Sequence, residues 1–461
     1  MVARARLTVA VVAVVITVVI SLALSACSEG PNDHRSVVLI TIDTLRADQL
    51  HSYGLDAPVS PRIDELAAGG VLFERAIAAS GATAPSHATI MTSLYALQNS
   101  IGPRNGFTRL LDEVTLAEVF RDAGYDTAAF VSNVVLRRRI GLDRGFQVYD
   151  DELSTPERNR PFLFERVAEH TTRRAIAWLK RSREARFFLW VHYQDPHGPY
   201  DPPEDFLGRV PHQPLPGESA LPVLEKHHGR GGIPAYQVIG DLRLPSQYRH
   251  RYAGEVLYAD HWVGELLTAV RAIRGGGDAI VLVTADHGES FGEERFYFLH
   301  SHTTTPDLSH VPFILVAPEL EPERRAELVS HVDVMPTLLE LAGHRVPRSV
   351  QGIALGPFLR SGEPLPDRVI FCDVPGEVSA YRADMLLRFS RRLSRGTSIT
   401  GHRWDSSGIL SQTRDALPLL REIRDYQRRA VPMVEIDPAD REDERHLRAL
   451  GYVESDAYEP E

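Results

Sequence analysis

Two almost uninterrupted apolar runs, each leading to an aspartate, constrain the fold of this chain more than any other feature. Residues 37–42 precede Asp43, and residues 279–284 precede Ala285 and Asp286. Runs of this length without polar alternation are typical of strands buried on both faces. In open α/β sheets, ligands gather at the carboxyl ends of strands, so we expect Asp43 and Asp286 to meet at one edge of the sheet.

Similar runs alternate with helical patterns along the rest of the chain. Further strands are predicted over residues 127–132, 187–193 and 312–316, and helices over residues 61–68, 85–95, 115–123, 164–181, 246–274 and 334–341. This alternation predicts an α/β fold with a large, mainly parallel central sheet covered by helices on both faces.

The length of 461 residues predicts more than one subdomain, because a single hydrophobic core stops growing near roughly 250 to 300 residues. We predict a larger domain over residues 36–361. A smaller subdomain over residues 362–461 should contain an antiparallel sheet followed by helices. Residues 201–245, rich in Pro, Gly, His and Arg, are predicted to form a long loop at the rim of a site.

The N-terminus has the pattern of a bacterial lipoprotein signal peptide. Two arginines precede an apolar run over residues 7–24, and the segment ending at Cys27 resembles a lipobox. We therefore expect residues 1–27 to direct export, lipidation of Cys27 to anchor the protein to a membrane of the bacterial cell envelope, and residues 28–35 to form a tether. An ordinary signal peptide or an anchor helix is the alternative. Each places the catalytic part outside the cytoplasm.

The charge balance argues against nucleic acid as a partner. The chain has 51 basic and 62 acidic residues, a net charge of −11. Removal of residues 1–26 takes away two arginines and makes the mature chain more negative. Nucleic-acid binding requires a basic surface. With Cys27 lipidated, Cys372 is the single remaining thiol, so no intrachain disulfide is expected.

Residues 81–87, Gly-Ala-Thr-Ala-Pro-Ser-His, open a helical stretch and place the Thr83 hydroxyl near a helix N-terminus, where anions are held. Proline prefers the first helical position, so Pro85 would put Ala84 at the cap and leave Thr83 free. The alternative is that Thr83 caps the helix. A hydroxyl is a weak nucleophile, so catalysis by Thr83 needs a cation. Its predicted ligands are Asp43, Thr83, Asp286 and His287.

Several blocks, in this order, resemble the sulfatase family of the alkaline phosphatase superfamily. They cover residues 38–48, 60–67, 81–87, 195–200, 284–289, 310–313, 331–339 and 447–452. The resemblance implies an alkaline-phosphatase-like fold and a metal-dependent hydrolase that cleaves a sulfate or phosphate ester. The substrate would be a small anionic ester, carried on a saccharide or a lipid.

Three positions depart from the family pattern. Sulfatases have Cys or Ser in a C/S-x-P-x-R signature, whereas this chain has Thr83 and His87. Threonine cannot become formylglycine, and the segment is similar instead to nucleotide pyrophosphatase/phosphodiesterases, which use the Thr hydroxyl directly on phosphorus. The usual Asp-Asp pair is Asp43-Thr44 here. With one carboxylate fewer and His287 present, one Zn²⁺ or Mn²⁺ ion is favoured over Ca²⁺ or Mg²⁺.

The resemblance also implies roles for other polar residues. His197 would contact the anion or protonate the leaving group. His300 and His302 fall where relatives keep a cation for the ester oxygens; His300 aligns best, and His302 is either an alternative contact or a surface residue. Asn105 would donate to a transition-state oxygen. His87 would either orient Thr83 or pack under the helix.

Two further functions remain open from the sequence. A phosphodiesterase or phosphoglycerol-type transferase of the same superfamily would use Thr83 in the same way. A non-catalytic binding protein with a decayed site would show no metal-dependent turnover.

Overall fold

The computed structural model describes residues 35–105, 108–182, 186–225, 230–273, 275–392, 396–404 and 410–436. The predicted signal segment, Cys27, the tether up to residue 34 and the block at 447–452 lie outside these residues. The described residues from Arg35 onward belong to one compact unit, and the predicted boundary at residue 361 stays a prediction. Among the described residues, no helix combines the length and apolar character needed to cross a membrane.

The central sheet has nine strands in the order β13-β2-β14-β10-β1-β7-β3-β4, with β15 also paired to β2. Its strands are β1 (Val37–Ile42), β2 (Val71–Ile77), β3 (Asp126–Phe130), β4 (Val148–Asp150), β7 (Phe187–Tyr193), β10 (Ile280–Ala285), β13 (His310–Val311), β14 (Phe313–Val316) and β15 (Glu323–Ser330). The strands from β10 to β4 run parallel, whereas β14 is antiparallel to β10. The prediction of a large, mainly parallel sheet is therefore confirmed.

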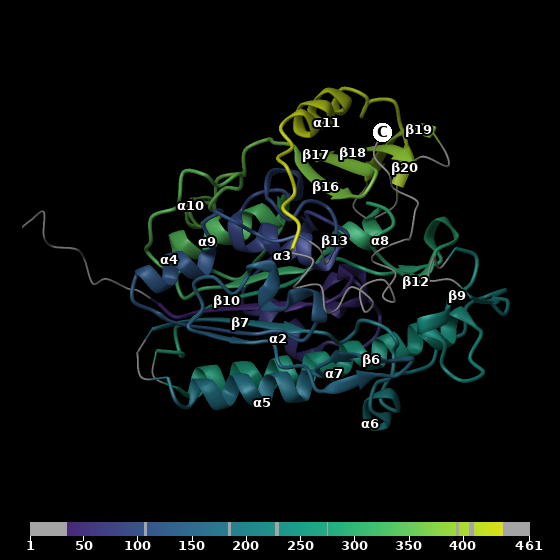
Figure 1. Ribbon diagram of the computed structural model, residues 1–461, viewed down its shortest axis with the longest axis horizontal. Coiled ribbons are helices and arrows are strands. Elements are labelled where there is room, and N and C mark those ends of the chain that lie inside the picture. Colours follow the sequence, from purple (N-terminus) through teal and green to yellow (C-terminus); the bar gives the residue numbers. More distant parts are fainter. Residues whose placement is uncertain are drawn as a thin grey trace, which may run out of the picture. The chain divides into compact units, whose positions relative to one another are not determined.

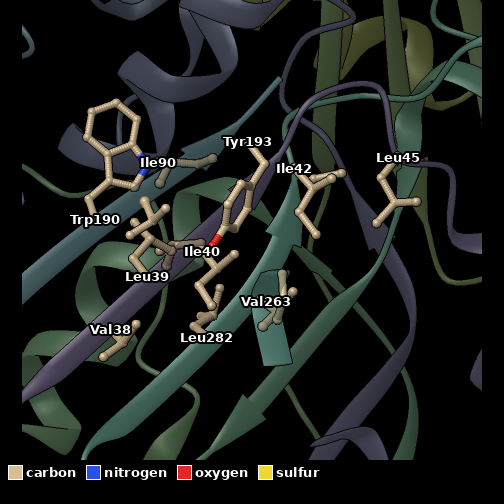
Figure 2. Close-up of a cluster of buried hydrophobic side chains, with 14 of the residues drawn as sticks. Val38, Leu39, Ile40, Ile42, Leu45, Ile90, Trp190, Tyr193, Val263 and Leu282 are labelled. Carbon is tan, nitrogen blue, oxygen red and sulfur yellow. The ribbon is translucent and has the colours of Figure 1, made fainter. Parts of the chain in front are cut away.

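Strand β1 lies at the centre of the core. All six of its residues are buried, and its side chains pack with Trp190 of β7, Leu282 of β10 and Val263 of helix α7 (Figure 2). On the opposite face from Val263, the Thr41 hydroxyl accepts a hydrogen bond from the Trp190 indole at 3.0 Å. The absence of polar alternation in this strand reflects burial on both faces.

Helices cover both faces of the sheet. In Figure 1, α5 (Ala168–Leu179) and α7 (Pro245–Ala272) lie below it, and α3 (Thr83–Thr92), α4 (Leu116–Asp122) and α9 (Val334–Leu341) lie above it. Helix α2 (Pro61–Ala68) packs against α7. Three further helices in this part of the chain are short, namely α6 (Glu204–Leu207), α8 (Pro306–Ser309) and α10 (Gly356–Ser361).

A second, antiparallel sheet lies in the C-terminal part of the chain, as predicted. Its strands pair in sequence order: β16 (Ile370–Val374), β17 (Glu377–Arg382), β18 (Met385–Arg392), β19 (Gly396–Trp404) and β20 (Leu410–Gln412). Helix α11 (Leu419–Arg428) packs against β17 and β18. A bridge between Ser80 and Asp373 connects this sheet to the loop before α3.

Two predicted helices differ from the structure in their bounds, and one strand was not predicted. Strand β6 (Arg160–Glu165) pairs with β5 (Thr155–Glu157), so the helix predicted from residue 164 begins at Ala168. Helix α3 runs from Thr83 to Thr92, not from 85 to 95, because Ser93 is left-handed (φ 57°) and ends it. Strand β2 was not predicted, since polar residues at 74 and 75 interrupt its apolar pattern.

The segment 201–245 is mostly irregular, as predicted, but contains short elements. Besides α6 it has the two-residue strands β8 (Val223–Leu224) and β9 (Ile233–Pro234). A further two-stranded sheet, β11 (Ser290–Phe291) with β12 (Tyr297–Leu299), follows β10.

A buried histidine connects the sheet to the loop before α3 and predicts an acid-sensitive fold. His331 Nδ1 accepts from the Ala79 N–H at 3.2 Å, and its Nε2–H donates to the Ala285 carbonyl at 2.9 Å. Burial lowers the pKa of His331 to about 3, below the unfolded value of about 6.5, so only the unfolded chain takes up this proton as the pH falls below about 6.5. This group alone should lower the free energy of unfolding by about 2 kcal/mol at pH 5.

The test is chemical denaturation of the wild type and of His331→Gln at pH 7 and pH 5. Buried carboxyl groups with raised pKa values, such as Asp195 and Glu255, act in the opposite direction in both proteins. The comparison therefore isolates His331. We expect a smaller loss between pH 7 and pH 5 in the variant, and an equal loss in both would contradict the assignment.

Candidate active site

Three buried side chains meet at the carboxyl ends of β1 and β10. In the parallel register Ile42 pairs with Ala285, so Asp43 and Asp286 leave the sheet side by side. One ligand atom from each of Asp43, Asp286 and His287 lies within 4.8 Å of the others. The expectation that the two aspartates meet at one edge of the sheet agrees with this geometry.

Hydrogen bonds hold one oxygen of each aspartate and leave the other free. Asn133 Nδ2 donates to Asp43 Oδ2 at 2.8 Å, while the N–H groups of Thr44 and His287 donate to Asp286 Oδ1 at 3.1 and 2.8 Å. Asp43 Oδ1 and Asp286 Oδ2 are buried and have no hydrogen-bond partner. Buried carboxylate oxygens without partners are costly unless a cation binds them.

His287 completes this group with a lone pair. Its Nδ1–H donates to the Gly288 carbonyl at 3.0 Å, so Nε2 is the unprotonated nitrogen. Nε2 lies 3.6 Å from Asp286 Oδ2 and 3.9 Å from Asp43 Oδ1. Burial raises the pKa of Asp43, and His287 and His300 partly counteract this. Two carboxylates and an imidazole suit a borderline divalent cation such as Zn²⁺ or Mn²⁺, so the residues present fit a metal ion.

Thr83 lies against this group at the start of α3. Its Oγ1 donates to His287 Nε2 at 3.2 Å, and the side chain is fully buried. The cap residue of α3 is Ala82, which makes no side-chain cap. The prediction that Ala84 caps the helix is therefore wrong, because proline is also tolerated further into the first turn, where backbone N–H groups have no helical partner. Thr83 itself does not cap the helix either.

His87 and Asn105 bind the backbone of the first turn of α3. His87 Nδ1–H donates to the Thr83 carbonyl at 2.8 Å, and its Nε2 accepts from the Thr41 hydroxyl at 2.9 Å. Burial lowers the pKa of His87 to about 3, so the ring is neutral. Asn105 Oδ1 accepts from the Ala84 N–H at 2.8 Å, whereas its Nδ2 is buried without a partner. His87 thus contacts the main chain of Thr83 rather than its hydroxyl.

Two further histidines extend the group away from the sheet. The ring of His300 stacks on His287 with centroids 4.7 Å apart, and the ring of His197 lies 5.0 Å from that of His300. Burial would lower the pKa of His300, but Glu289, which accepts from its Nδ1 at 3.2 Å, outweighs this and the pKa is raised. Burial and the neighbouring His300 hold the pKa of His197 well below its usual value.

His302 lies apart from the ligand atoms described above. Its ring packs on Phe296 with centroids 3.9 Å apart, and its Nε2 is 3.5 Å from Ser290 Oγ. These contacts belong to the β11–β12 hairpin. Of the three histidines predicted to contact the substrate, His302 is therefore the one whose contacts lie outside the candidate site.

Three neighbours of the site were not assigned from the sequence. Asn133 follows the carboxyl end of strand β3, and this position is the sequence feature that could have indicated a site residue. His192 lies inside strand β7, and its Nε2 is 3.6 Å from Asp43 Oδ2. The alternation of side chains along a strand is equally compatible with a core residue at this position. Glu289 follows His287 closely and accepts from both His300 and the Tyr200 hydroxyl, the latter at 3.0 Å.

Comparison with known proteins places this chain among the ester-bond hydrolases of the alkaline phosphatase superfamily. A family model described as Sulfatase matches residues 35–344, and the chain belongs to this family. The predicted family and the predicted hydrolase class are therefore confirmed. Sulfatases generally use a metal ion, for which Asp43, Asp286 and His287 are a possible ligand group.

The proteins similar to this chain include sulfatases and a phosphonate monoester hydrolase. The chain is 27% identical over 375 residues to a Delta 4,5-hexuronate-2-O-sulfatase from Bacteroides thetaiotaomicron, covering 74% of each chain. It is 24% identical over 409 residues to the multifunctional alkaline phosphatase superfamily protein PehA of Trinickia caryophylli, covering 72% of this chain and 78% of that protein. A phosphonate monoester hydrolase from Silicibacter pomeroyi shares the fold, with a TM-score of 0.67 and 22% identity over 86% of this chain and 96% of that one.

Proposed function

We propose that the protein is a metal-dependent hydrolase of a sulfate or phosphate ester and that Thr83 is its nucleophile. The observation that carries this proposal is the contact of Thr83 Oγ1 with His287 Nε2 at 3.2 Å, beside two carboxylate oxygens that lack partners. The Thr83 hydroxyl therefore lies next to the atoms that would hold the metal.

Asp43, Asp286, His287 and Thr83 would hold a Zn²⁺ or Mn²⁺ ion. When bound, such an ion lowers the pKa of a hydroxyl and screens the charge of the ester oxygens. The Thr83 oxygen attacks the sulfur or phosphorus atom in line with the leaving alcohol, and a water molecule then releases the oxyanion from Thr83. His87 and Asn105 keep the first turn of α3 fixed during both steps, since both bind its backbone.

The leaving group faces the histidines on the far side of the cluster. The contact with Glu289 raises the pKa of His300, which favours His300 as the residue that protonates the leaving oxygen. His197, next to it, has two ring nitrogens without partners and contacts the alcohol part of the ester.

Two arguments bear on the transferred group. A Thr ester lacks the hemiacetal hydroxyl through which formylglycine expels sulfate, so Thr83 favours phosphorus on chemical grounds. The similarity to a hexuronate 2-O-sulfatase favours a sulfate ester on a saccharide. The proposal retains both oxyanions, and the experiment below separates them.

The location proposed for this activity is the outside of a bacterial membrane. The support is the apolar segment after Arg4 and Arg6 and the lipobox-like sequence that ends at Cys27. Radiolabelled palmitate incorporation, lost in Cys27→Ala, would test lipidation.

The activity is tested on purified protein with 4-nitrophenyl sulfate, 4-nitrophenyl phosphate and bis(4-nitrophenyl) phosphate, before and after removal of metal by a chelator. We expect turnover of at least one ester, a fall of at least about 10³-fold in kcat/KM on metal removal, and recovery with Zn²⁺ or Mn²⁺. The ester that is turned over identifies the oxyanion. Equal rates with and without metal would contradict the mechanism, and no turnover of any ester would favour a non-catalytic binding protein.

A further inference from the structure

A small pocket lies beside the candidate site. Its walls include Asn133, Glu157, Phe164, Glu165, Gln194 and His197. Strands β5 and β6 form a hairpin that supplies Glu157, Phe164 and Glu165. The pocket runs from the buried Gln194, 7% exposed, to Phe164, which is 40% exposed and gives it a side open to solvent.

Two residues of this wall join the pocket to the reacting centre. Asn133 donates to Asp43 Oδ2 at 2.8 Å, and the ring of His197 lies 5.0 Å from that of His300. An ester whose oxyanion lies at Thr83 would therefore direct its alcohol part toward this pocket.

The side chains of the pocket mainly accept hydrogen bonds. Gln194 Oε1 is buried and has no partner, and neither ring nitrogen of His197 has one. Because the pKa of His197 is well below its usual value, the ring is neutral and keeps a lone pair.

The pocket wall also contains two acidic side chains, Glu157 and Glu165, and Glu157 is paired with a neighbouring cation. This cation is Arg160, whose guanidinium lies over the ring of Tyr236 at 4.3 Å. Glu165 is half-buried, and burial together with Glu157 and Asp195 raises its pKa well above the usual value, an effect that Arg160 only partly offsets. One carboxyl group among acceptors thus remains without a matching cation.

We propose that this pocket binds a primary ammonium group on the alcohol part of the ester, so that the substrate is the ester of an amino alcohol. An ammonium group has three donors and no acceptor, which matches Glu165, Gln194 Oε1 and the neutral His197. A neutral hydroxyl would supply donors but no positive charge, so it would not stabilise the ionised form of Glu165, which burial and the neighbouring acidic groups disfavour. This inference rests on the proposed function, because it assumes that the ester is cleaved at Thr83.

The test compares esters that differ only in the amine. The full-length protein is assayed with the phosphate and sulfate esters of 2-aminoethanol and the 6-esters of glucosamine, each with its N-acetylated form, which keeps the hydroxyl groups and loses the charge. We expect kcat/KM for the amine to exceed that for the amide by about 10- to 100-fold, the range of a hydrogen bond to a charged group. The better of the two amines distinguishes a small amino alcohol from an amino sugar.

A variant pair assigns this preference to the pocket. Glu165→Gln should reduce the amine-to-amide ratio at least about 10-fold, whereas Glu204→Gln, the same change at an exposed residue of α6, should leave the ratio as in the wild type. Thermal melting of both variants confirms that they fold, and Glu165→Asp, which keeps the charge, should retain part of the preference.

The outcomes separate the two proposals. Turnover of 4-nitrophenyl esters with no preference for the amine, or a preference unchanged in Glu165→Gln, overturns the ammonium pocket and leaves the proposed function standing. Absence of metal-dependent turnover with 4-nitrophenyl and amino alcohol esters alike overturns the proposed function itself.

Discussion

Replacing Thr83 by alanine is expected to lower kcat/KM by at least about 10⁴-fold, the scale seen when a catalytic nucleophile is removed. The Thr83 hydroxyl is fully buried, and its partner is His287 Nε2 at 3.2 Å. In the proposed mechanism it is the hydroxyl that attacks a substrate held at the group formed by Asp43, Asp286 and His287. The loss should appear in kcat as well as in kcat/KM, because the attacking atom itself is missing.

Two variants make this result specific. Thr83→Ser keeps the hydroxyl and should retain turnover above the alanine variant. Thr89→Ala removes another buried hydroxyl of α3, one that donates to the Pro85 carbonyl at 3.1 Å, and should cost stability without removing turnover. If Thr83→Ala keeps turnover within about 10-fold of the wild type, another group attacks the ester and Thr83 only contributes to metal binding.

The sequence could predict the residues that follow the buried strands. Asp43 and Asp286 each come directly after an apolar strand, and the parallel register of β1 and β10 places both at one edge. This part was predictable because strand pairing depends on backbone geometry and on apolar burial, both of which are visible as a pattern in the sequence.

Residues whose role depends on side-chain contacts between elements could not be predicted in the same way. His192 reaches Asp43 from the neighbouring strand β7, and only its orientation separates it from a core residue. Glu165 was predicted to belong to a helix, whereas it ends the second strand of a hairpin beside His197. The start of α3 was misplaced because Pro85 fits several positions of a first turn equally well.

A second large effect is expected for Asp286→Asn, which should weaken binding of Zn²⁺ or Mn²⁺ by more than about 100-fold, since changes outside the ligand shell already cost 10- to 100-fold. The asparagine Oδ1 can still accept from the N–H groups of Thr44 and His287, which hold Asp286 Oδ1 in the wild type. Its amide nitrogen would replace the free Oδ2 and present hydrogens toward the cation. Isothermal titration of metal-free protein measures this loss without any assay of activity.

The same variant should show opposite effects on stability with and without metal. In metal-free protein, ligand oxygens of Asp43 and Asp286 lie within 4.8 Å of each other in a buried site, so removing one charge relieves repulsion and should raise the melting temperature. Added Zn²⁺ or Mn²⁺ should raise the melting temperature of the wild type but not of the variant. Asp260→Asn is the matched control: this buried carboxylate accepts from the N–H groups of Arg62 and Ile63 at the start of α2, and its loss should leave the metal-dependent shift intact. A metal-dependent shift that persists in Asp286→Asn would place the cation elsewhere and remove the chemical basis for Thr83 as the nucleophile.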